Sequence, residues 1–159
     1  MSATRSDGSA GLRFLNDFIF LLNKKWKSGN TRKPTISKIW TRKVTGLISR
    51  GARDVLITLD DESPQIFSLQ QKDQDDNAFW DWLHDVGLTI EVRTGTSVDD
   101  ALSIVSEITR IIKTNVTLVT GVDDNEYVQM LPGSIVSRNE EFRNLFRYIM
   151  EVSVLKYNP

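Results

Sequence analysis

The sequence predicts an α+β protein: a mixed, mainly antiparallel sheet with two main helices packed on it. Two patterns support this prediction. Apolar residues recur at helical spacing in the stretches 11–27 and 97–113, and elsewhere they alternate with polar residues or form short runs, as in strands. A chain of 159 residues is long enough for one domain that buries about two-thirds of its unfolded surface. We expect residues 11–159 to form that domain, after a polar, flexible tail at 1–10.

The first helix ends in lysines, which favour the C-terminal end of a helix dipole. Ser28-Gly29-Asn30 stops it, because glycine adopts the left-handed C-cap conformation readily. A short strand is predicted at 36–41. Two further strands, at 55–59 and 65–69, are predicted to be joined by a turn at Asp60–Pro64. The apolar positions that define the first helix are Leu12, Leu15, Phe18, Ile19, Leu22 and Trp26.

A strand followed by a helix is the clearest local pattern in the chain. Apolar and polar residues alternate from Leu88 to Arg93, which is typical of a strand with one buried face. After a short turn, Ser97 is placed to cap a helix over 97–113, with Asp100 at the return position of a capping box.

The remaining elements are less regular. The aromatic segment at 79–83 fits one helical turn or an irregular plug. A strand is predicted at 127–131, ending at Pro132-Gly133. The chain then closes with a long strand from Phe146 to Leu155, which exceeds the usual five or six residues. We therefore expect this last strand to lie centrally in the sheet or to extend toward a neighbouring subunit.

The charge of the chain is segregated by sign, although its net value is only -1. From Asp54 to Asp85 there are nine acids and one lysine. The segment before it, from Lys24 to Arg53, is a basic run. Three interpretations fit this run: a solvated face, contact with the acidic segment of the next subunit in a head-to-tail ring, or contact with nucleic acid. This run has ten cations and no acid; they are Lys24, Lys25, Lys27, Arg32, Lys33, Lys38, Arg42, Lys43, Arg50 and Arg53.

Several classes of site are excluded by composition. The chain has no cysteine, which removes thiol catalysis, disulfides and thiolate metal ligands. His84 is the only histidine, so a histidine zinc cluster cannot form. We predict neither a cofactor nor a metal. The apolar run Phe18–Leu22 is far shorter than a membrane span of ~20 residues, and no secretory signal precedes it. We therefore expect an intracellular soluble protein without membrane contact.

One short segment suggests an enzyme. Glu91-Val92-Arg93 resembles the second half of the PD-(D/E)XK nuclease motif, in which an acid and a lysine share one face of a strand and serve a divalent metal. Asp54 or Asp85 would supply the second acid. Arginine stands where that family has lysine and cannot lose its proton near neutral pH. Simple alternation of an amphipathic strand accounts for the same residues, and we favour a non-enzymatic protein.

Three stretches resemble the small tail-terminator and head-to-tail joining proteins of tailed viruses, including uncharacterised archaeal proviral proteins of the same layout. Residues 54–58 resemble the strand that opens their sheet after a basic lead containing proline. Residues 88–113 resemble their strand and long helix. Residues 142–152 resemble their C-terminal strand, which is entered through an arginine and aromatic pair. The likeness covers about residues 12–157, but the segment 70–85, with two tryptophans, is not part of that pattern.

This resemblance implies a structural part of a virion. Such proteins form a ring of identical subunits, usually six, that caps the tail tube and joins it to the neck, with DNA only passing through. The implied partners are copies of the chain itself and the tail-tube and neck proteins. The implied location is the virion, with the host cytoplasm during assembly. Besides the nuclease, a small nucleic-acid-binding module that uses residues 24–53 is the alternative.

Overall fold

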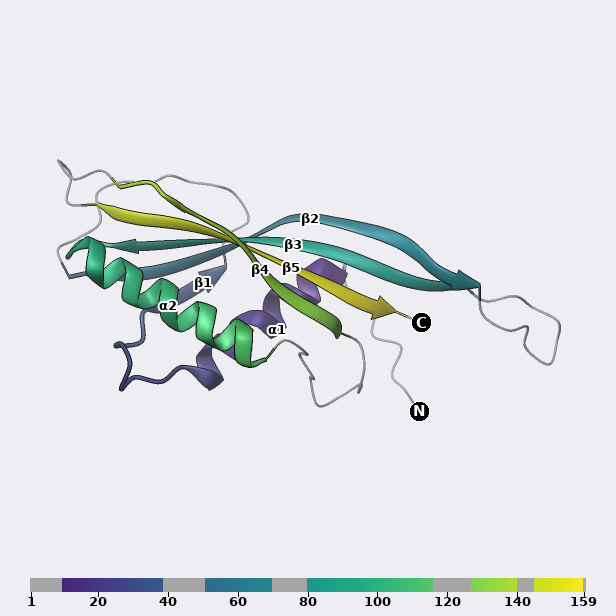
Figure 1. Cartoon of the computed structure of the whole chain (residues 1–159), viewed down its shortest axis with the longest axis horizontal. Coiled ribbons are helices and arrows are strands. Elements are labelled where there is room, and N and C mark those ends of the chain that lie inside the picture. Colours follow the sequence, from purple (N-terminus) through teal and green to yellow (C-terminus); the bar gives the residue numbers. More distant parts are fainter. Residues whose placement is uncertain (1–9, 39–50, 70–79, 116–126, 140–144, 159) are drawn as a thin grey trace.

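The computed structural model describes residues 10–38, 51–69, 80–115, 127–139 and 145–158. Ala10 already belongs to the first helix, and residues 1–9 of the expected tail lie outside the described part of the chain. The α+β prediction is confirmed. The elements follow in the order α1 (Ala10–Lys25), β1 (Thr35–Lys38), β2 (Arg53–Leu69), β3 (Trp80–Thr94), α2 (Val98–Thr114), β4 (Tyr127–Ser137) and β5 (Phe146–Asn158) (Figure 1).

The strands form one five-stranded sheet in the order β1-β2-β3-β5-β4. β1 and β2 pair in parallel, and every other neighbouring pair is antiparallel. The sheet is therefore mixed and mainly antiparallel, as predicted. β5 is the last strand of the chain but lies between β3 and β4, which confirms the central position expected from its length.

Both helices pack on the same face of the sheet. α1 contacts β1, β2 and β3, and α2 contacts β3, β4 and β5. Figure 1 shows both helices on one side of the strands. Alternate strand residues point toward them, and each fully buried Ile or Leu there contributes roughly 1.5–3 kcal/mol. The fully or almost fully buried residues of this face include Val55, Ile57, Leu88, Ile90, Val92, Met150 and Val152, packed against Phe14, Phe18, Ile104, Ile108 and Ile111.

The start of α2 follows the predicted cap in part. Ser97 has an extended backbone (φ -165°), and its hydroxyl accepts a hydrogen bond from the backbone N–H of Asp100 at 3.1 Å. The reciprocal half of the capping box is replaced by a longer-range contact, because the Asp100 carboxylate pairs with Arg53 at 3.1 Å. The cap therefore also ties α2 to the beginning of β2.

Two predicted breaks are strands in the structure. Asp60–Pro64 was expected to form a turn, but β2 continues through it to Leu69. The segment 79–83 was expected to be a helical turn or a plug, but β3 begins at Trp80. Proline lacks a backbone N–H, so a strand tolerates it where no neighbouring strand needs that donor, as at the edge of a sheet. β1 covers only residues 54–57 of β2, so Pro64 lies where no strand within the described chain needs that donor.

β4 also extends further than expected. It passes through Pro132-Gly133, where the prediction ended it, and reaches Ser137. Its pairing with β5 is irregular between Pro132 and Ile135, so the turn-forming residues lie in a bulge and do not end the strand. The predicted strand at 36–41 is found as β1 up to Lys38, and its last residues lie outside the described chain.

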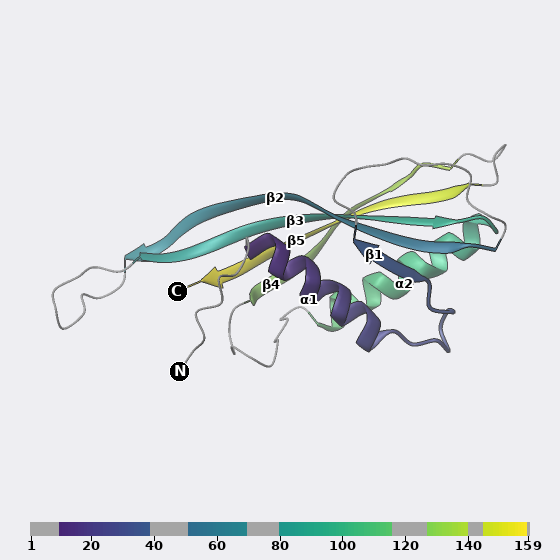
Figure 2. The same cartoon turned by 180° about the vertical axis from the view of Figure 1, so that it is seen from behind.

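A row of irregularities crosses the middle of the sheet. β2 has a register shift between Leu59 and Asp61, opposite Gly87 of β3. A Cβ on Gly87 would collide with the Asp61 carboxylate. At the same level, Pro132 begins the irregularity of β4. Bulges strengthen the twist of a sheet. Beyond this row β2 and β3 run past the helices as an extended arm (Figures 1 and 2).

Neither helix of the described chain has both the length and the apolar composition that a membrane crossing requires.

Candidate functional site

The structure describes seven of the ten cations in the basic run, and it places them in different surroundings. The side chains of Lys24 and Lys25 are exposed at the end of α1, and that of Lys38 is exposed on β1, with its Nζ 2.9 Å from Asn16 Oδ1. Lys27, Arg32 and Lys33 are exposed in the connection between these elements. The remaining surface candidates, Arg42, Lys43 and Arg50, lie outside the described residues.

The side chain of Arg53 points inward, so it cannot contribute to the predicted contact surface. It is 8% exposed. Its Nη2 donates to the Thr31 hydroxyl at 2.6 Å, its Nη1 donates to the carbonyl of Arg32, and its Nε pairs with Asp100. The residue fastens the lead into β1, the start of β2 and the start of α2 to one another. Nothing in its sequence context separates it from the exposed cations.

Charges of opposite sign lie along one edge of the sheet. Lys38 of β1 is the register partner of Ile57. Exposed Asp60 and Asp61 follow a few residues further along the same strand. Lys38 of the basic segment and Asp60 and Asp61 of the acidic segment therefore lie along the same edge within one subunit. The acids at 73, 75 and 76 lie outside the described residues.

A shallow cavity of about 410 Å³ opens where β1 and β2 begin. Arg32 and Lys33 bring positive charge to its wall, and Asp54 brings negative charge. It gathers polar groups from two chain segments without enclosing a ligand site. The lining residues are Arg32, Lys33, Pro34, Thr35, Gly51, Ala52, Arg53 and Asp54.

A four-residue charged cluster lies on the face of the sheet opposite the helices. Asp54, Arg93 and Arg147 are successive partners across β2, β3 and β5, and Glu91 lies two residues before Arg93. Arg93 Nη2 is 3.8 Å from Asp54 Oδ2, and Arg147 Nη1 is 3.4 Å from Glu91 Oε1. The side chains are 14% exposed for both arginines, 18% for Glu91 and 31% for Asp54.

This cluster contains the acids of the nuclease hypothesis. Asp54 is diagonal to Glu91 on the adjacent strand, a separation of about 7–8 Å. Asp85 is six residues from Glu91 along one strand, or roughly 20 Å, which removes it as the second acid. Each remaining carboxylate faces an arginine, so a metal would have to displace both ion pairs. The described residues hold no group of three or more His, Cys, Asp or Glu suited to a metal ion.

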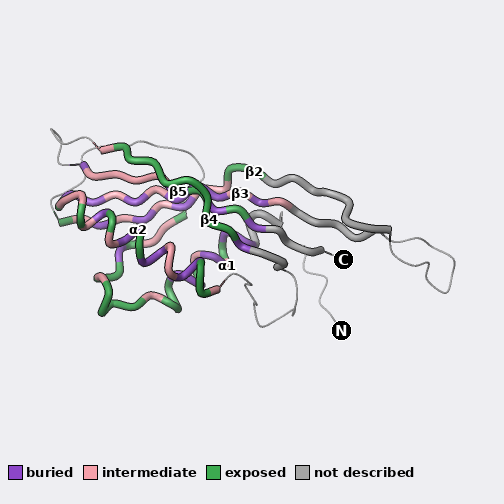
Figure 3. Tube along the Cα trace, in the orientation of Figure 1, coloured by how far each residue is buried: buried purple, intermediate pink, exposed green. Residues whose placement is uncertain are grey.

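β4 is the outer strand at one edge of the sheet, and it carries no charged residue from Tyr127 to Ser137. Leu131 is 44% exposed, Ile135 47% and Val136 38%. Ile135 pairs with Met150 of the helix-covered face, whereas Val136 pairs with Ile149 of the opposite face. Figure 3 shows β4 as exposed over much of its length, beside buried central strands. An edge strand is normally blunted by charges, and β4 lacks them.

The opposite edge of the sheet is also open along part of its length. β1 pairs with β2 only as far as Ile57. No other strand in the described part of the chain pairs with that side of β2, so among the described residues the edge from Thr58 to Leu69 has no strand partner.

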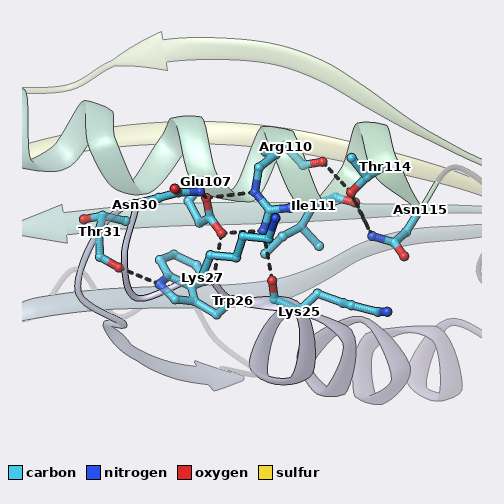
Figure 4. Close-up of polar contacts among 10 residues, drawn as sticks. All are labelled: Lys25, Trp26, Lys27, Asn30, Thr31, Glu107, Arg110, Ile111, Thr114 and Asn115. Atoms are coloured by element: carbon cyan, nitrogen blue, oxygen red, sulfur yellow. Dashed lines mark hydrogen bonds and ion pairs between the residues drawn. The ribbon is translucent and has the colours of Figure 1, made fainter.

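A second charge cluster, between the helices, is structural. Glu107 of α2 is buried, and its carboxylate accepts from the Lys27 backbone N–H at 2.9 Å and from Asn30 Nδ2 at 2.8 Å (Figure 4). Arg110 donates to it through Nε at 3.0 Å and Nη2 at 2.5 Å, and also donates to the carbonyl of Lys25 at 2.9 Å. These contacts join α2 to the end of α1.

The same contacts change the acidity of Glu107. The hydrogen bond from Arg110 is the largest cause, and those from Asn30 and Lys27 add to it, whereas burial opposes them. Together they lower the pKa of Glu107 from 4.5 to about 2. The carboxylate is therefore charged at any physiological pH. No local sequence pattern indicates this cluster, because Lys27 and Glu107 are 80 residues apart along the chain.

No protein-family model matches the chain, and no curated protein matches it either. A search of solved structures finds a chain from a structure titled "Virion of native gene transfer agent (GTA) particle". The alignment covers 94% of this chain and 100% of that chain, with 11% sequence identity and a TM-score of 0.49. A similarity of this size describes neither function nor partners.

Proposed function

We propose that this protein is a structural part of a tailed virion: a ring-forming tail-terminator or head-to-tail joining protein. Two lines of support meet in this proposal. The stretches 54–58, 88–113 and 142–152 resemble that class of protein in sequence. The fold supplies what a ring needs, a subunit with different contact surfaces on its two sides.

The exposed edge of β4 is the observation that carries the proposal. An uncharged strand of 11 residues with exposed Leu131, Ile135 and Val136 would invite unwanted pairing in a monomer. In a ring, a neighbouring copy covers it. The free side of β2 lies at the other edge of the sheet, so the two contact surfaces differ and a head-to-tail arrangement can close.

Light scattering coupled to size-exclusion chromatography tests the ring. We expect an assembly of about 109 kDa for six copies of the 18.1 kDa chain. Leu131→Lys places a charge on the β4 edge and should shift the population toward the monomer. The matched control is Phe20→Lys, which changes an apolar residue of α1 that is 64% exposed, the highest value among the large apolar residues described, and should leave the assembly intact. A wild-type protein that stays monomeric at every concentration would contradict the proposal.

The nuclease is the second candidate, and one observation favours it: Asp54, Glu91 and Arg93 share a face of adjacent strands. Incubating plasmid DNA with the protein and Mg²⁺ tests it. We expect no cleavage, since arginines occupy both carboxylates. Cleavage that disappears in Glu91→Ala would establish the enzyme instead.

A nucleic-acid-binding role for residues 24–53 is tested by titrating DNA at several salt concentrations. Each neutralised phosphate steepens the fall of affinity with salt. We expect only weak, non-specific binding, because the Arg53 side chain is bonded to Asp100 and Thr31 within the subunit. Tight binding that is lost in Lys24→Glu or Lys33→Glu would favour the module.

A further inference from the structure

We propose that β4 of one copy pairs with the free edge of β2 in the next copy, so that the sheets of neighbouring subunits become continuous. This inference rests on the proposed ring and names its interface. The two edges are the outer side of β4, Tyr127–Ser137, and the side of β2 that β1 leaves open beyond Ile57.

The directions of the strands favour this pair. β2 and β3, β3 and β5, and β5 and β4 are each antiparallel. β4 therefore runs opposite to β2 within one subunit. If the next copy is related by rotation about an axis roughly along the strands, its β2 meets β4 as an antiparallel partner. Antiparallel pairing continues the pattern of the sheet and is the more stable form per residue.

The two free edges also lie at the same level of the sheet. One row joins Leu59 of β2, Leu88 of β3, Val152 of β5 and Pro132 of β4. The free part of β2 begins beside this row and continues to Leu69. On β4, the segment from Gln129 to Pro132, which lies between the two irregularities of its pairing with β5, occupies the same half of the sheet. Two segments at one level can pair without a large shift along the strands.

The charges of the edges select this pairing over the others. Asp60 and Asp61 are exposed on β2, so two β2 edges brought together would place like charges opposite each other. β4 has no charge and offers no such repulsion. Within the described residues β1 offers only four positions, which is a shorter ladder than the β2 edge would give. Two β4 edges could pair only as a closed two-fold dimer, which would leave the β2 edges unused.

Disulfide trapping tests the interface, because the chain has no cysteine of its own. Leu131→Cys is combined in separate proteins with Asp61→Cys, Ser63→Cys or Gln65→Cys. Positions 61, 63 and 65 are paired with residues 87, 85 and 83 of β3 and lie on one face of the sheet, so they sample three neighbouring registers opposite Leu131. Cα atoms must approach to about 4–7 Å for the bond to form.

We expect one double variant to form a ladder of cross-linked species under mild oxidation, ending at the size of the closed ring. The control pair, Leu131→Cys with Phe20→Cys, should not form this ladder. Variants are compared after circular dichroism has shown native strand content, and the three positions on β2 guard against one substitution that fails to fold.

The other outcomes overturn the inference in distinguishable ways. Dimers from Leu131→Cys alone would show that β4 pairs with β4. A wild-type-sized assembly in which no β2 position cross-links would place the interface elsewhere and leave the ring standing. An absence of any assembly would refute both the ring and this interface.

Discussion

Glu107 and Glu91 are both mostly buried carboxylates that face an arginine, but their surroundings differ. Glu107 accepts four hydrogen bonds of 2.5–3.0 Å from Arg110, Asn30 and the backbone of Lys27. Glu91 has one arginine contact, at 3.4 Å, and its neighbour Arg93 has an ion pair of 3.8 Å. A buried charge stabilises a fold only when hydrogen bonds replace its lost hydration. The Glu107 cluster should hold the fold together, whereas the cluster on the sheet should be tolerant of change.

The largest effect is expected at Glu107. Glu107→Ala removes the acceptor of three partners in a site that is closed to water, and we expect unfolding free energy to fall by about 3–5 kcal/mol. Urea denaturation followed by circular dichroism measures it. Glu107→Gln keeps one oxygen for the Lys27 N–H and should lose less. A change under about 1 kcal/mol in Glu107→Ala would remove the distinction between the clusters.

Acid should weaken the same cluster. The folded pKa of Glu107, about 2, lies below its usual 4.5, so its contribution is complete above pH 4.5 and is lost as pH falls toward 2. A shift of this size corresponds to roughly 3 kcal/mol. The stability difference between wild type and Glu107→Gln should therefore shrink across this window. If that difference stays constant with pH, the carboxylate is not the source of the stability.

A smaller effect is expected at Glu91. Glu91→Gln weakens a single long ion pair with Arg147, and we expect a loss of about 1 kcal/mol or less. Thermal and urea denaturation beside Glu107→Gln compare the two carboxylates directly. An equal loss at both positions would contradict the contrast drawn from their hydrogen bonds.

The smallest effect is expected at Arg93. Within the described chain its Nε is buried without a hydrogen-bond partner, and it lies directly opposite Arg147. Arg93→Met removes this one unpaired donor and a like-charge neighbour of Arg147 at the cost of the long ion pair with Asp54, so stability should change by no more than about 1 kcal/mol, with a gain as the expected direction. Equilibrium unfolding measures this. A loss of several kcal/mol would show that Arg93 holds the sheet together.

The sequence predicted the elements whose pattern is local. The alternation of 88–93, the Ser97 cap and the helical spacing that follows all reappear as β3 and α2, because short-range preferences and burial agree there. The long final strand and its central place were also predictable, since its alternating pattern runs for longer than a usual strand. Asp60–Pro64 misled the prediction, because turn-forming residues are tolerated on a free strand edge.

The candidate sites were predictable only in part. Ten cations without an intervening acid predicted an exposed contact surface. The Arg53 side chain is nevertheless turned inward, because it bonds to Asp100 and Thr31, which are distant in sequence. The Glu107 cluster likewise depends on contacts between the end of α1 and the middle of α2. The exposed edge of β4 could not be read from its composition, because an uncharged apolar strand is typical of a central position. Only the order of the strands shows that it lies outside.

The order of strands also sets the order in which the sheet can be completed. β4 precedes β5 in the chain but lies outside it in the sheet, so β4 joins the sheet only when β5 has been synthesised and has docked on β3. That docking joins positions such as Leu88 and Val152, and closing so long a loop is slow compared with forming a hairpin. Until β5 is available, β4 is an uncharged strand with both edges open, and after it pairs with β5 its outer edge stays open. Mispairing on the folding pathway should therefore begin at β4, and a nascent chain is at its most aggregation-prone just before its last strand emerges.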